Sequence, residues 1–320
     1  MPTAHIKIAA SAGLLLLLAS LGAAQDGDAK PLLTVAVNRQ DGFELINIDI
    51  EGKNEQSLLS EPTGVAEPTW SPDGKRLACV LFRSGPGQIY VMNADGSDLK
   101  NITNTTSHER SPAWSPDGSK IVFTSNRSGN QDIFAMNPDG TEQTNLSSNL
   151  GYDADAAWSP DSKSIAFASQ RDGKAFRVYS MKADGSEQKD MFGKDQYGWL
   201  YPAWSADGRQ ILYGGPYGRD VQLFVANFNG EGKQKITSGA AVNSYASWSP
   251  EGSYIAFVHL NTFDTPFTPG KAPSEQQPGG DLMLYDVVAS TTTKLIAGKL
   301  PLWGPRPAWK PVGAAAAATK

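Results

Sequence analysis

The sequence predicts an all-β chain, a six-bladed β-propeller whose blades are four-stranded antiparallel sheets. Three observations lead to this prediction. A tryptophan recurs at nearly constant spacing, short apolar runs with alternating patterns follow each tryptophan, and tight-turn signals separate the runs. A repeat of about 44 residues with four strands per unit is typical of a propeller blade.

One copy of the repeat, residues 111–146, shows how a unit is built. Alternating apolar residues in 121–125 and 133–136 favour strands, because β-branched and aromatic side chains fit a pleated, half-buried surface. The segment 115–118 reads Ser-Pro-Asp-Gly, which places proline where φ is already set and glycine where φ is positive. Residues 137–140 repeat this turn code. Each unit is therefore predicted to be a meander of strands a to d, with the tryptophan in strand a.

The period is clearest in the tryptophans of strand a. Successive spacings are 44, 44, 46 and 44 residues, and a sixth tryptophan follows after 61. The extra length lies in a Pro/Gly-rich insertion, residues 261–280, which we interpret as a b–c loop. The six tryptophans are Trp70, Trp114, Trp158, Trp204, Trp248 and Trp309. We interpret them as core between blades, because large rings fill such layers.

The two ends of the repeat region complement each other. Residues 33–59 match residues 121–147 at an offset of 88, twice the period, and supply strands b, c and d. The segment around Trp309 supplies a strand a with no strands after it. We therefore expect both ends to share one sheet, which closes the ring and removes exposed sheet edges.

The regions outside the repeats have simpler signatures. Residues 1–24 have a basic start, an apolar run and small residues at the end, as in a secretory signal, so we expect export to the periplasm or outside the cell. The apolar run is too short for a membrane span. A short linker, 25–31, precedes the propeller, 32–311, and residues 312–320 are predicted to be a disordered Ala-rich tail.

Composition excludes several classes of partner. The formal net charge is −5, which disfavours nucleic acid and anionic lipid as electrostatic partners. Cys79 is the single cysteine, so no internal disulfide can form, and we interpret it as a core residue. One turn departs from the Ser-Pro-Asp-Gly code, because Ser162 replaces its glycine. A positive φ at a residue other than glycine costs about 1–2 kcal/mol. This hairpin could therefore adopt a different turn type.

Strand order assigns the connections to two faces. The a–b and c–d turns share one face, and the more diverse b–c and d–a connections share the other. Positions that differ between copies are free to recognise a partner. The residue three before each tryptophan varies among the copies, and these residues should surround a central channel. With their neighbours they form the predicted binding site: Glu67, His108, Arg110, Ser111, Asp153, Asp155, Trp199, Tyr201, Tyr245, Trp303 and Arg306.

Several of these residues have a second interpretation. Trp199 and Trp303 fall outside the repeat register and are candidates for a contact surface. Asp153 and Asp155 with Glu109 are oxygen ligands of the kind Ca²⁺ takes, but no Ca²⁺-loop spacing is present, so solvated carboxylates are preferred and no cofactor is expected. Arginines of the b–c loops either meet partner carboxylates or brace their own loops: Arg39, Arg83, Arg127 and Arg171.

Signals for catalysis and metal binding are weak. His108 and His259 match no metal-ligand spacing, and the sequence has neither a G-x-S-x-G elbow nor a phosphate-binding Gly-Lys-Ser/Thr loop. We therefore assign no catalytic or metal-binding residue and expect a monomeric protein that is not an enzyme.

The repeated pattern P-x-W-S-P-D-G, followed by strands of the type I-A-F and I-Y-x-M-N-x-D-G, resembles the WD40-like (PD40) repeat of the TolB-like propeller family. The resemblance covers residues 32–311. It implies a six-bladed, periplasmic and non-catalytic propeller that binds the peptidoglycan-associated lipoprotein across one face. The family also has an α/β domain before the propeller, whereas about seven residues here separate the signal from the first strand.

These expectations combine into one functional hypothesis and two rivals. The chain is expected to be an exported scaffold of the cell envelope that binds a protein or peptidoglycan-associated partner on the b–c/d–a face. Related repeats occur in oligogalacturonate lyases and serine peptidases, so one rival is a lyase-like enzyme acting on acidic oligosaccharides, or a peptidase-associated propeller, with His108 as a candidate residue. The other rival is a purely structural module.

Overall fold

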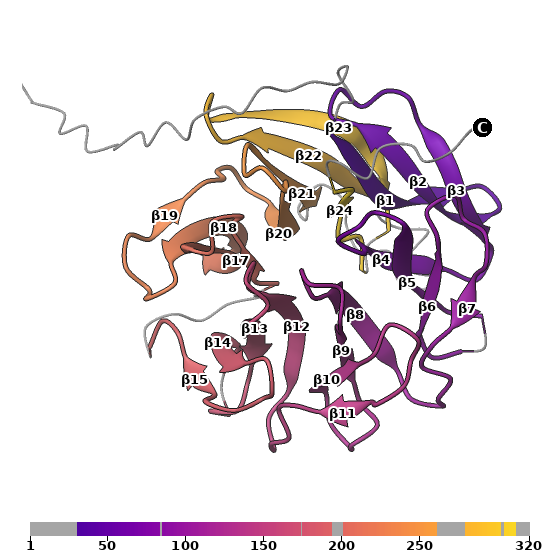
Figure 1. The fold of residues 1–320 in the computed structure, drawn as a ribbon. Coiled ribbons are helices and arrows are strands. Elements are labelled where there is room, and N and C mark those ends of the chain that lie inside the picture. The colour runs from indigo at the N-terminus through magenta and orange to yellow at the C-terminus, as the bar shows by residue number, and fades with distance from the viewer. Residues whose placement is uncertain are drawn as a thin grey trace, which may run out of the picture.

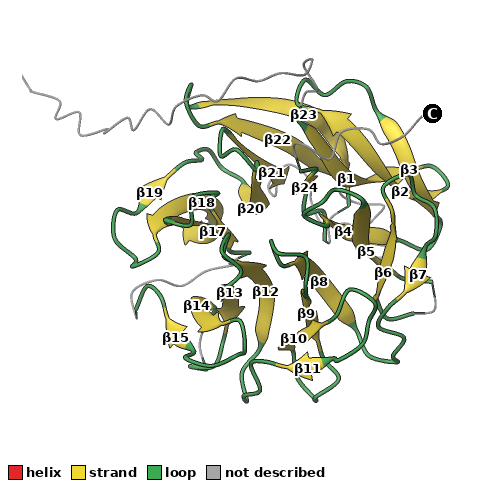
Figure 2. Ribbon diagram, in the orientation of Figure 1, coloured by secondary structure: helices red, strands yellow, loops and turns green. Residues whose placement is uncertain are grey.

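The computed structural model describes residues 31–83, 85–173, 175–193, 201–260, 279–301 and 304–311. Within these ranges the chain forms strands joined by turns and loops, with no helix and hence no helical membrane span (Figure 2). The predicted all-β class and four-stranded antiparallel sheets are confirmed. The predicted signal, the Ala-rich tail, most of the insertion, Trp199 and Trp303 lie outside the described residues.

The strands follow the meander pattern along the chain. The first three are β1 (Leu32–Arg39), β2 (Gly42–Asp49) and β3 (Gln56–Glu61). The next eight are β4 (Val65–Trp70), β5 (Arg76–Leu81), β6 (Gln88–Asn93), β7 (Lys100–Asn101), β8 (Glu109–Trp114), β9 (Ile121–Ser125), β10 (Asp132–Met136) and β11 (Thr144–Asn145). Then come β12 (Asp153–Trp158), β13 (Ser164–Ser169), β14 (Arg177–Lys182), β15 (Lys189–Asp190), β16 (Ala203–Trp204), β17 (Gln210–Tyr217), β18 (Asp220–Asn227) and β19 (Gln234–Lys235). The last are β20 (Val242–Trp248), β21 (Tyr254–Leu260), β22 (Gly280–Asp286), β23 (Thr291–Leu300) and β24 (Ala308–Trp309).

Most sheets contain consecutive strands. The orders are β4-β5-β6-β7, β8-β9-β10-β11 and β12-β13-β14-β15. Strands β16 to β23 belong to one eight-stranded sheet, in which a single parallel contact, Val221 with Val242, joins two antiparallel meanders. Figure 1 shows the sheets arranged around a centre, with β4, β8, β12, β20 and β24 on the inside.

The remaining sheet joins the two ends of the described chain. Its order is β24-β1-β2-β3, with Leu33 opposite Trp309 and Thr34 opposite Ala308. The backbone N–H of Lys310 donates to the carbonyl oxygen of Leu32 at 2.9 Å. The predicted pairing of the Trp309 segment with the first strand is therefore observed.

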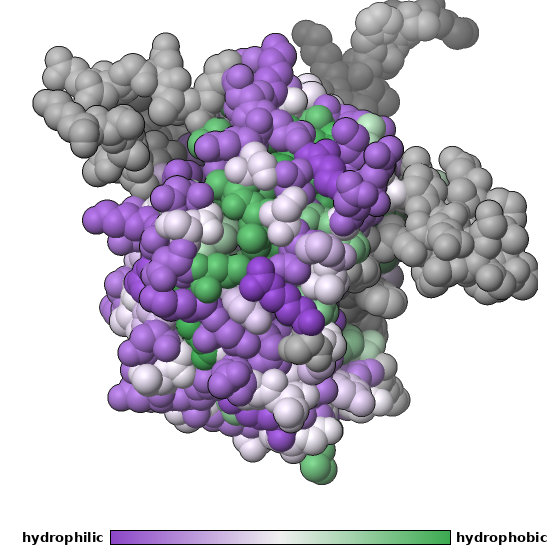
Figure 3. Space-filling model, turned by 90° about the vertical axis from the view of Figure 1, so that its right-hand side faces the viewer, coloured by the Kyte–Doolittle hydropathy of each residue, from purple (hydrophilic) through white to green (hydrophobic). Residues whose placement is uncertain are grey.

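The hydrophobic core is divided into clusters between neighbouring sheets. One cluster packs Leu33 and Val35 of β1 against Val258 and Leu282 of β21 and β22. The repeat tryptophans also pack into these clusters, and Trp70 is 6% exposed, in agreement with their interpretation as core. Figure 3 views the side that carries β3, β6 and β7, where a short apolar strip is bordered by hydrophilic surface. Burial of apolar side chains between sheets thus holds the meanders together.

Glycine in the c–d hairpins has a role beyond the turn. Gly185 has φ of 86°, and a Cβ atom placed on it would lie 2.6 Å from the carbonyl oxygen of Leu146 in the preceding meander. The same oxygen accepts a hydrogen bond from Gln188 Nε2 at 2.9 Å. Gly52 lies in the same way on Leu295. These hairpins therefore dock on the backbone of the neighbouring sheet, which leaves no room for a side chain.

The hairpin at Ser162 has the same turn type as the other hairpins, although the sequence left a different type open. Ser162 has φ of 59°, and its N–H donates to the carbonyl oxygen of Ser159 at 2.9 Å, as Gly118 does to Ser115 at 2.8 Å. A different turn type at this position is therefore wrong. The Ser162 hydroxyl accepts a hydrogen bond from the Asp117 N–H at 3.1 Å, which offsets part of the backbone strain.

Candidate binding channel

The innermost strands share a bulge where the ring of site residues was predicted. Register shifts occur in β4, β8, β12 and β20, in each case between the residues four and one before the tryptophan. The residue three before the tryptophan has positive φ: Glu67 (52°), Ser111 (50°), Asp155 (57°), Tyr201 (22°) and Tyr245 (53°). A bulge re-aims a side chain, and strained residues cluster at functional sites. The bulge is thus the local structure that positions this ring.

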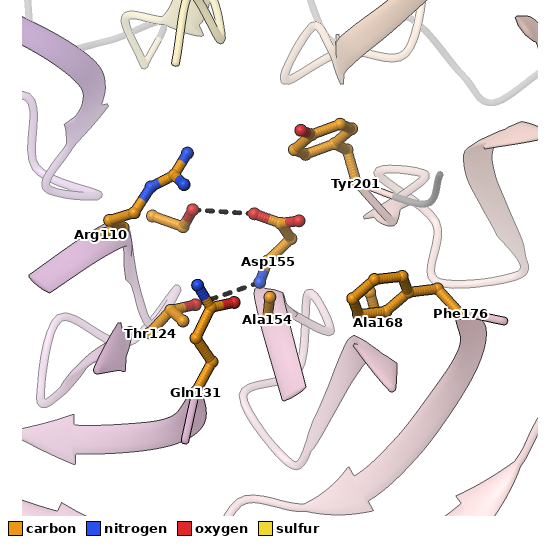
Figure 4. Close-up of a pocket in the computed structure, with 9 residues that line it drawn as sticks. Arg110, Thr124, Gln131, Ala154, Asp155, Ala168, Phe176 and Tyr201 are labelled. Atoms are coloured by element: carbon orange, nitrogen blue, oxygen red, sulfur yellow. Dashed lines mark hydrogen bonds between the residues drawn. The ribbon is translucent and has the colours of Figure 1, made fainter. Parts of the chain in front are cut away.

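Polar contacts link the ring residues Glu67, Ser111 and Asp155, with Arg110 beside them. Arg110 Nη2 lies 3.2 Å from Glu67 Oε1, and the backbone N–H of Ser111 donates to Glu67 Oε2 at 2.6 Å. The Ser111 hydroxyl donates to Asp155 Oδ1 at 2.8 Å. Figure 4 shows this last bond, with Arg110 and Tyr201 directed toward the same space. These contacts connect β4, β8 and β12 across the channel.

Two tyrosines and an arginine complete the ring. The Tyr201 hydroxyl donates to the Tyr245 hydroxyl at 3.0 Å, with ring centroids 4.1 Å apart. Burial raises the pKa of both phenols, so both are neutral at physiological pH. Arg306 Nη2 donates to the carbonyl oxygen of Pro202 at 3.2 Å. The ring therefore holds its tyrosines as hydrogen-bonding groups and not as bases.

The charges of the ring are unequally compensated. Glu67 is the main cause that raises the pKa of Arg110, which is consistent with their ion pair. Burial raises the pKa of the Asp155 carboxyl, and the nearby positive charge of Arg110 and the Ser111 hydroxyl offset this only in part. Asp155 is therefore a carboxylate that gains from an additional positive partner.

A small cavity adjoins Asp155. Its volume is about 160 Å³. It is lined by ring residues and by Thr124, Ala154, Ala168, Gln131 and Phe176 (Figure 4). Gln131 and Phe176 directly precede strands β10 and β14, so they belong to b–c connections. Sequence reasoning missed both residues, although their shared position differs between copies. The cavity thus extends from the channel toward the b–c/d–a face.

Two other predicted site residues brace loops instead. His108 accepts a hydrogen bond on Nδ1 from the Gly87 N–H at 2.8 Å. Asp153 is buried and forms an ion pair with Arg171 Nη2 at 3.0 Å. Neither lines the cavity beside Asp155. The preferred interpretation of Asp153, Asp155 and Glu109 as solvated carboxylates is wrong, because Asp153 and Glu109 are buried and paired with arginines of b–c loops. Among the described residues no three acidic, histidine or cysteine side chains cluster as a metal site.

The structure decides whether the arginines of the b–c loops are free for a partner or brace their own loops. Arg83 pairs with Glu61 at 2.6 Å, and Arg127 pairs with Glu109 at 2.9 Å. Arg39 likewise pairs with Glu44 at 2.7 Å. The Arg171 guanidinium also lies 4.6 Å from the centre of the Tyr179 ring. Arg39, Arg127 and Arg171 therefore brace their own meanders, in the second of the two predicted roles. Arg83 instead joins its b–c loop to the end of β3 in the neighbouring sheet.

The His108 contact predicts a pH dependence of stability. Burial, followed by the nearby charge of Arg110, lowers the pKa of His108 from its ordinary value of 6.5. The unfolded chain therefore binds this proton at a higher pH than the folded chain. The stabilising contribution is complete above about pH 6.5 and is lost as the pH falls through the folded-state pKa.

We expect the free energy of unfolding to fall between pH 7 and pH 5, as measured by urea titrations at each pH. In His108→Gln, whose amide oxygen can also accept from Gly87, this component of the slope should disappear. An identical slope in the variant would contradict the assignment.

Comparisons with known proteins agree with this fold. The family model described as "TolB beta propeller domain" matches residues 32–215. The Tol-Pal system protein TolB of Thioalkalivibrio sulfidiphilus is 37% identical over 71 residues, which are 21% of this chain and 16% of that protein. The chain thus matches about a sixth of that relative's length.

Two solved structures share the fold over most of the chain. TolB from Acinetobacter baumannii superposes with a TM-score of 0.74 and 22% identity, and covers 89% of this chain and 68% of its own. A putative TolB from Agrobacterium tumefaciens gives a TM-score of 0.66 and 20% identity, with coverage of 88% and 98%. At these identities the likeness shows the fold alone. Because the family model matches more than half of the sequence, the chain belongs to the TolB β-propeller domain family.

Proposed function

We propose that this chain is an exported, non-catalytic scaffold of the cell envelope that binds a protein or peptidoglycan-associated partner in the periplasm. In this proposal residues 1–24 are a removed signal and residues 32–311 form six blades, the last completed by both ends. The pairing of β24 with β1 supports closure of the ring. The printed name of the relatives, Tol-Pal system protein, supports an envelope role.

The observation that carries the proposed binding site is the bulged ring beside the cavity. Strained backbone directs side chains of five meanders toward one channel, and the cavity extends from it toward the b–c/d–a face. Loops of that face also carry exposed apolar side chains: Leu150 (104%), Tyr152 (51%) and Tyr217 (55%). Exposed aromatic and apolar groups next to a pocket are typical of protein-binding surfaces.

The geometry favours binding over catalysis. The Tyr201 and Tyr245 phenols are neutral and bonded to each other, and Glu67 is held by Arg110 and Ser111. His108, the residue that a lyase-like activity would use, lies in the d–a connection before β8, and its Nδ1 accepts a hydrogen bond from Gly87 in the b–c loop of the preceding meander. The carboxylate whose burial is only partly offset by neighbouring groups is Asp155, so we propose that the partner presents a basic side chain to it.

The test is binding of the purified peptidoglycan-associated lipoprotein from the same host. Asp155→Asn is expected to weaken binding to the full chain at least tenfold, measured by calorimetry. The control is Asp139→Asn, an exposed aspartate of the hairpin between β10 and β11 on the opposite face, which should bind as the unaltered chain does. Unchanged affinity in Asp155→Asn, or no binding by the unaltered chain, would reject the proposed partner site.

A further inference from the structure

A second cavity lies at the opposite end of the channel. Its volume is about 350 Å³, within the range of ligand sites. The a–b turns contribute Pro72, Pro116 and Pro250, so this cavity opens on the face where the sequence placed only tight hairpins. Strand a contributes the other walls. Among the described residues six prolines border it, together with Trp70, Trp114, Trp158, Trp248 and Trp309.

Tryptophan and proline side chains make up most of the described wall of this cavity, which we call the funnel. The tryptophan rings are packed between sheets. Trp158 Nε1 donates to the carbonyl oxygen of Ala113 at 3.2 Å, and Trp309 Nε1 to that of Ser247 at 3.2 Å. The Nε1 atoms of Trp114 and Trp248 have no hydrogen-bond partner among the described residues, but they are buried and so not exposed to a ligand in the cavity. Proline has no backbone N–H to donate. The funnel therefore offers ring edges and pyrrolidines, which suit apolar groups and not sugars.

Within the part of the chain that the structure describes, Arg306 is the one charged side chain that borders the funnel. It stands three residues before Trp309, whereas the turn prolines follow their tryptophans by two. The two positions are five residues apart, and with the usual rise per residue of a strand this places Arg306 roughly 15 Å from the turn prolines at the mouth of the funnel. Its partner among the described residues is the Pro202 carbonyl oxygen, whereas Arg110 has the carboxylate of Glu67. A guanidinium has five N–H donors, so Arg306 retains donors for a ligand.

Burial also lowers the pKa of Arg306, because the channel desolvates its charge. Asp155 and Glu67 lie near enough to offset this only in part. A buried cation in an apolar site gains most from a carboxylate, since the planar guanidinium and the carboxylate match in a two-bond arrangement.

We propose that this funnel is a second binding site, which takes the C-terminal carboxylate of an extended apolar peptide. The carboxylate binds Arg306, and the last two or three residues lie against the tryptophan and proline wall. A terminal carboxylate fits better than a side chain within a longer segment, because Arg306 lies deep in the funnel, behind the turn prolines that border its mouth. The funnel opens at the other end of the channel from the surface assigned to the envelope partner. Arg306 also belongs to the ring, so the acid-against-amide comparison, and not a ring variant, tests the two sites separately.

The test uses two short peptides and the full chain. Acetyl-Leu-Pro-Phe with a free carboxylate and the same peptide with a C-terminal amide are titrated while intrinsic tryptophan fluorescence is recorded. We expect saturable binding of the acid, at least tenfold tighter than the amide. Equal affinities, or no saturable signal, would overturn the proposal, and this comparison needs no variant.

Variants then locate the carboxylate. In Arg306→Gln the affinity for the acid should fall at least tenfold, to that of the amide, and Arg306→Lys should restore part of the difference. Arg219→Gln, in the exposed loop between β17 and β18 on the opposite face, is the matched control and should bind the acid normally. An acid-over-amide preference that survives in Arg306→Gln would contradict the site.

Discussion

Replacing Arg127 with leucine should lower the free energy of unfolding by about 3–5 kcal/mol, because the change leaves a buried carboxylate without its counter-charge. The Glu109 side chain is 0% exposed, and its Oε1 lies 2.9 Å from Arg127 Nη2. The Thr105 hydroxyl also donates to this oxygen at 2.7 Å, but a hydroxyl carries no charge. Arg127 further lies 4.9 Å from the centre of the Phe134 ring, so packing is lost as well.

Two comparisons separate the charge effect from packing. Lys100→Leu removes an ion pair, 2.8 Å from Asp98, in which both side chains are more than half exposed, and we expect a loss below about 1 kcal/mol. The double variant Arg127→Leu with Glu109→Leu removes both charges and should recover most of the loss. Urea unfolding measures all four proteins. A double variant less stable than Arg127→Leu alone would contradict the buried-pair account.

Gly185→Ala should destabilise the fold by about 2–4 kcal/mol. Alanine at φ of 86° costs about 1–2 kcal/mol in backbone strain. The new Cβ would in addition lie 2.6 Å from the Leu146 carbonyl oxygen, so the hairpin must move away from the preceding sheet. This movement would also disturb the Gln188 hydrogen bond to the same oxygen. Thermal or urea unfolding gives the difference.

The matched control is Gly173→Ala. Gly173 has a similar φ of 79° in an exposed b–c loop, and a Cβ there would meet nothing within 4 Å. We expect only the backbone cost of about 1–2 kcal/mol. Equal losses at Gly185 and Gly173 would show that the hairpin does not dock on the neighbouring sheet.

Local signals explain why so much of the fold could be predicted. The Ser-Pro-Asp-Gly code specifies its own turn, and the tryptophan marks strand a, so each meander can be assigned from a few neighbouring residues. The pairing of Trp309 with Leu33 followed from counting, because strands b to d stood at one end and an unpaired strand a at the other. The ring position three before each tryptophan was found in the same way.

What could not be predicted depends on residues brought together by the fold. The positive φ at Glu67 and Asp155 arises from a bulge that has no turn residue to announce it. The role of Arg127 depends on whether Glu109 is buried beside it, which no spacing reveals. The funnel was missed for a related reason. Its tryptophans were correctly interpreted as core, but their exposed edges form a site only when the sheets surround Arg306.

The central claim is that the two ends of the repeat region share one sheet. Leu33 and Trp309 form a pair flanked by the hydrogen bond from Lys310 to Leu32, which brings their Cα atoms to about 4.5 Å and their Hα atoms into contact. The direct measurement is a nuclear Overhauser effect between these two Hα atoms in isotope-labelled protein. We expect a strong cross-peak. Its absence, with a cross-peak from Leu33 to a residue of any strand other than β24 in its place, would contradict the account.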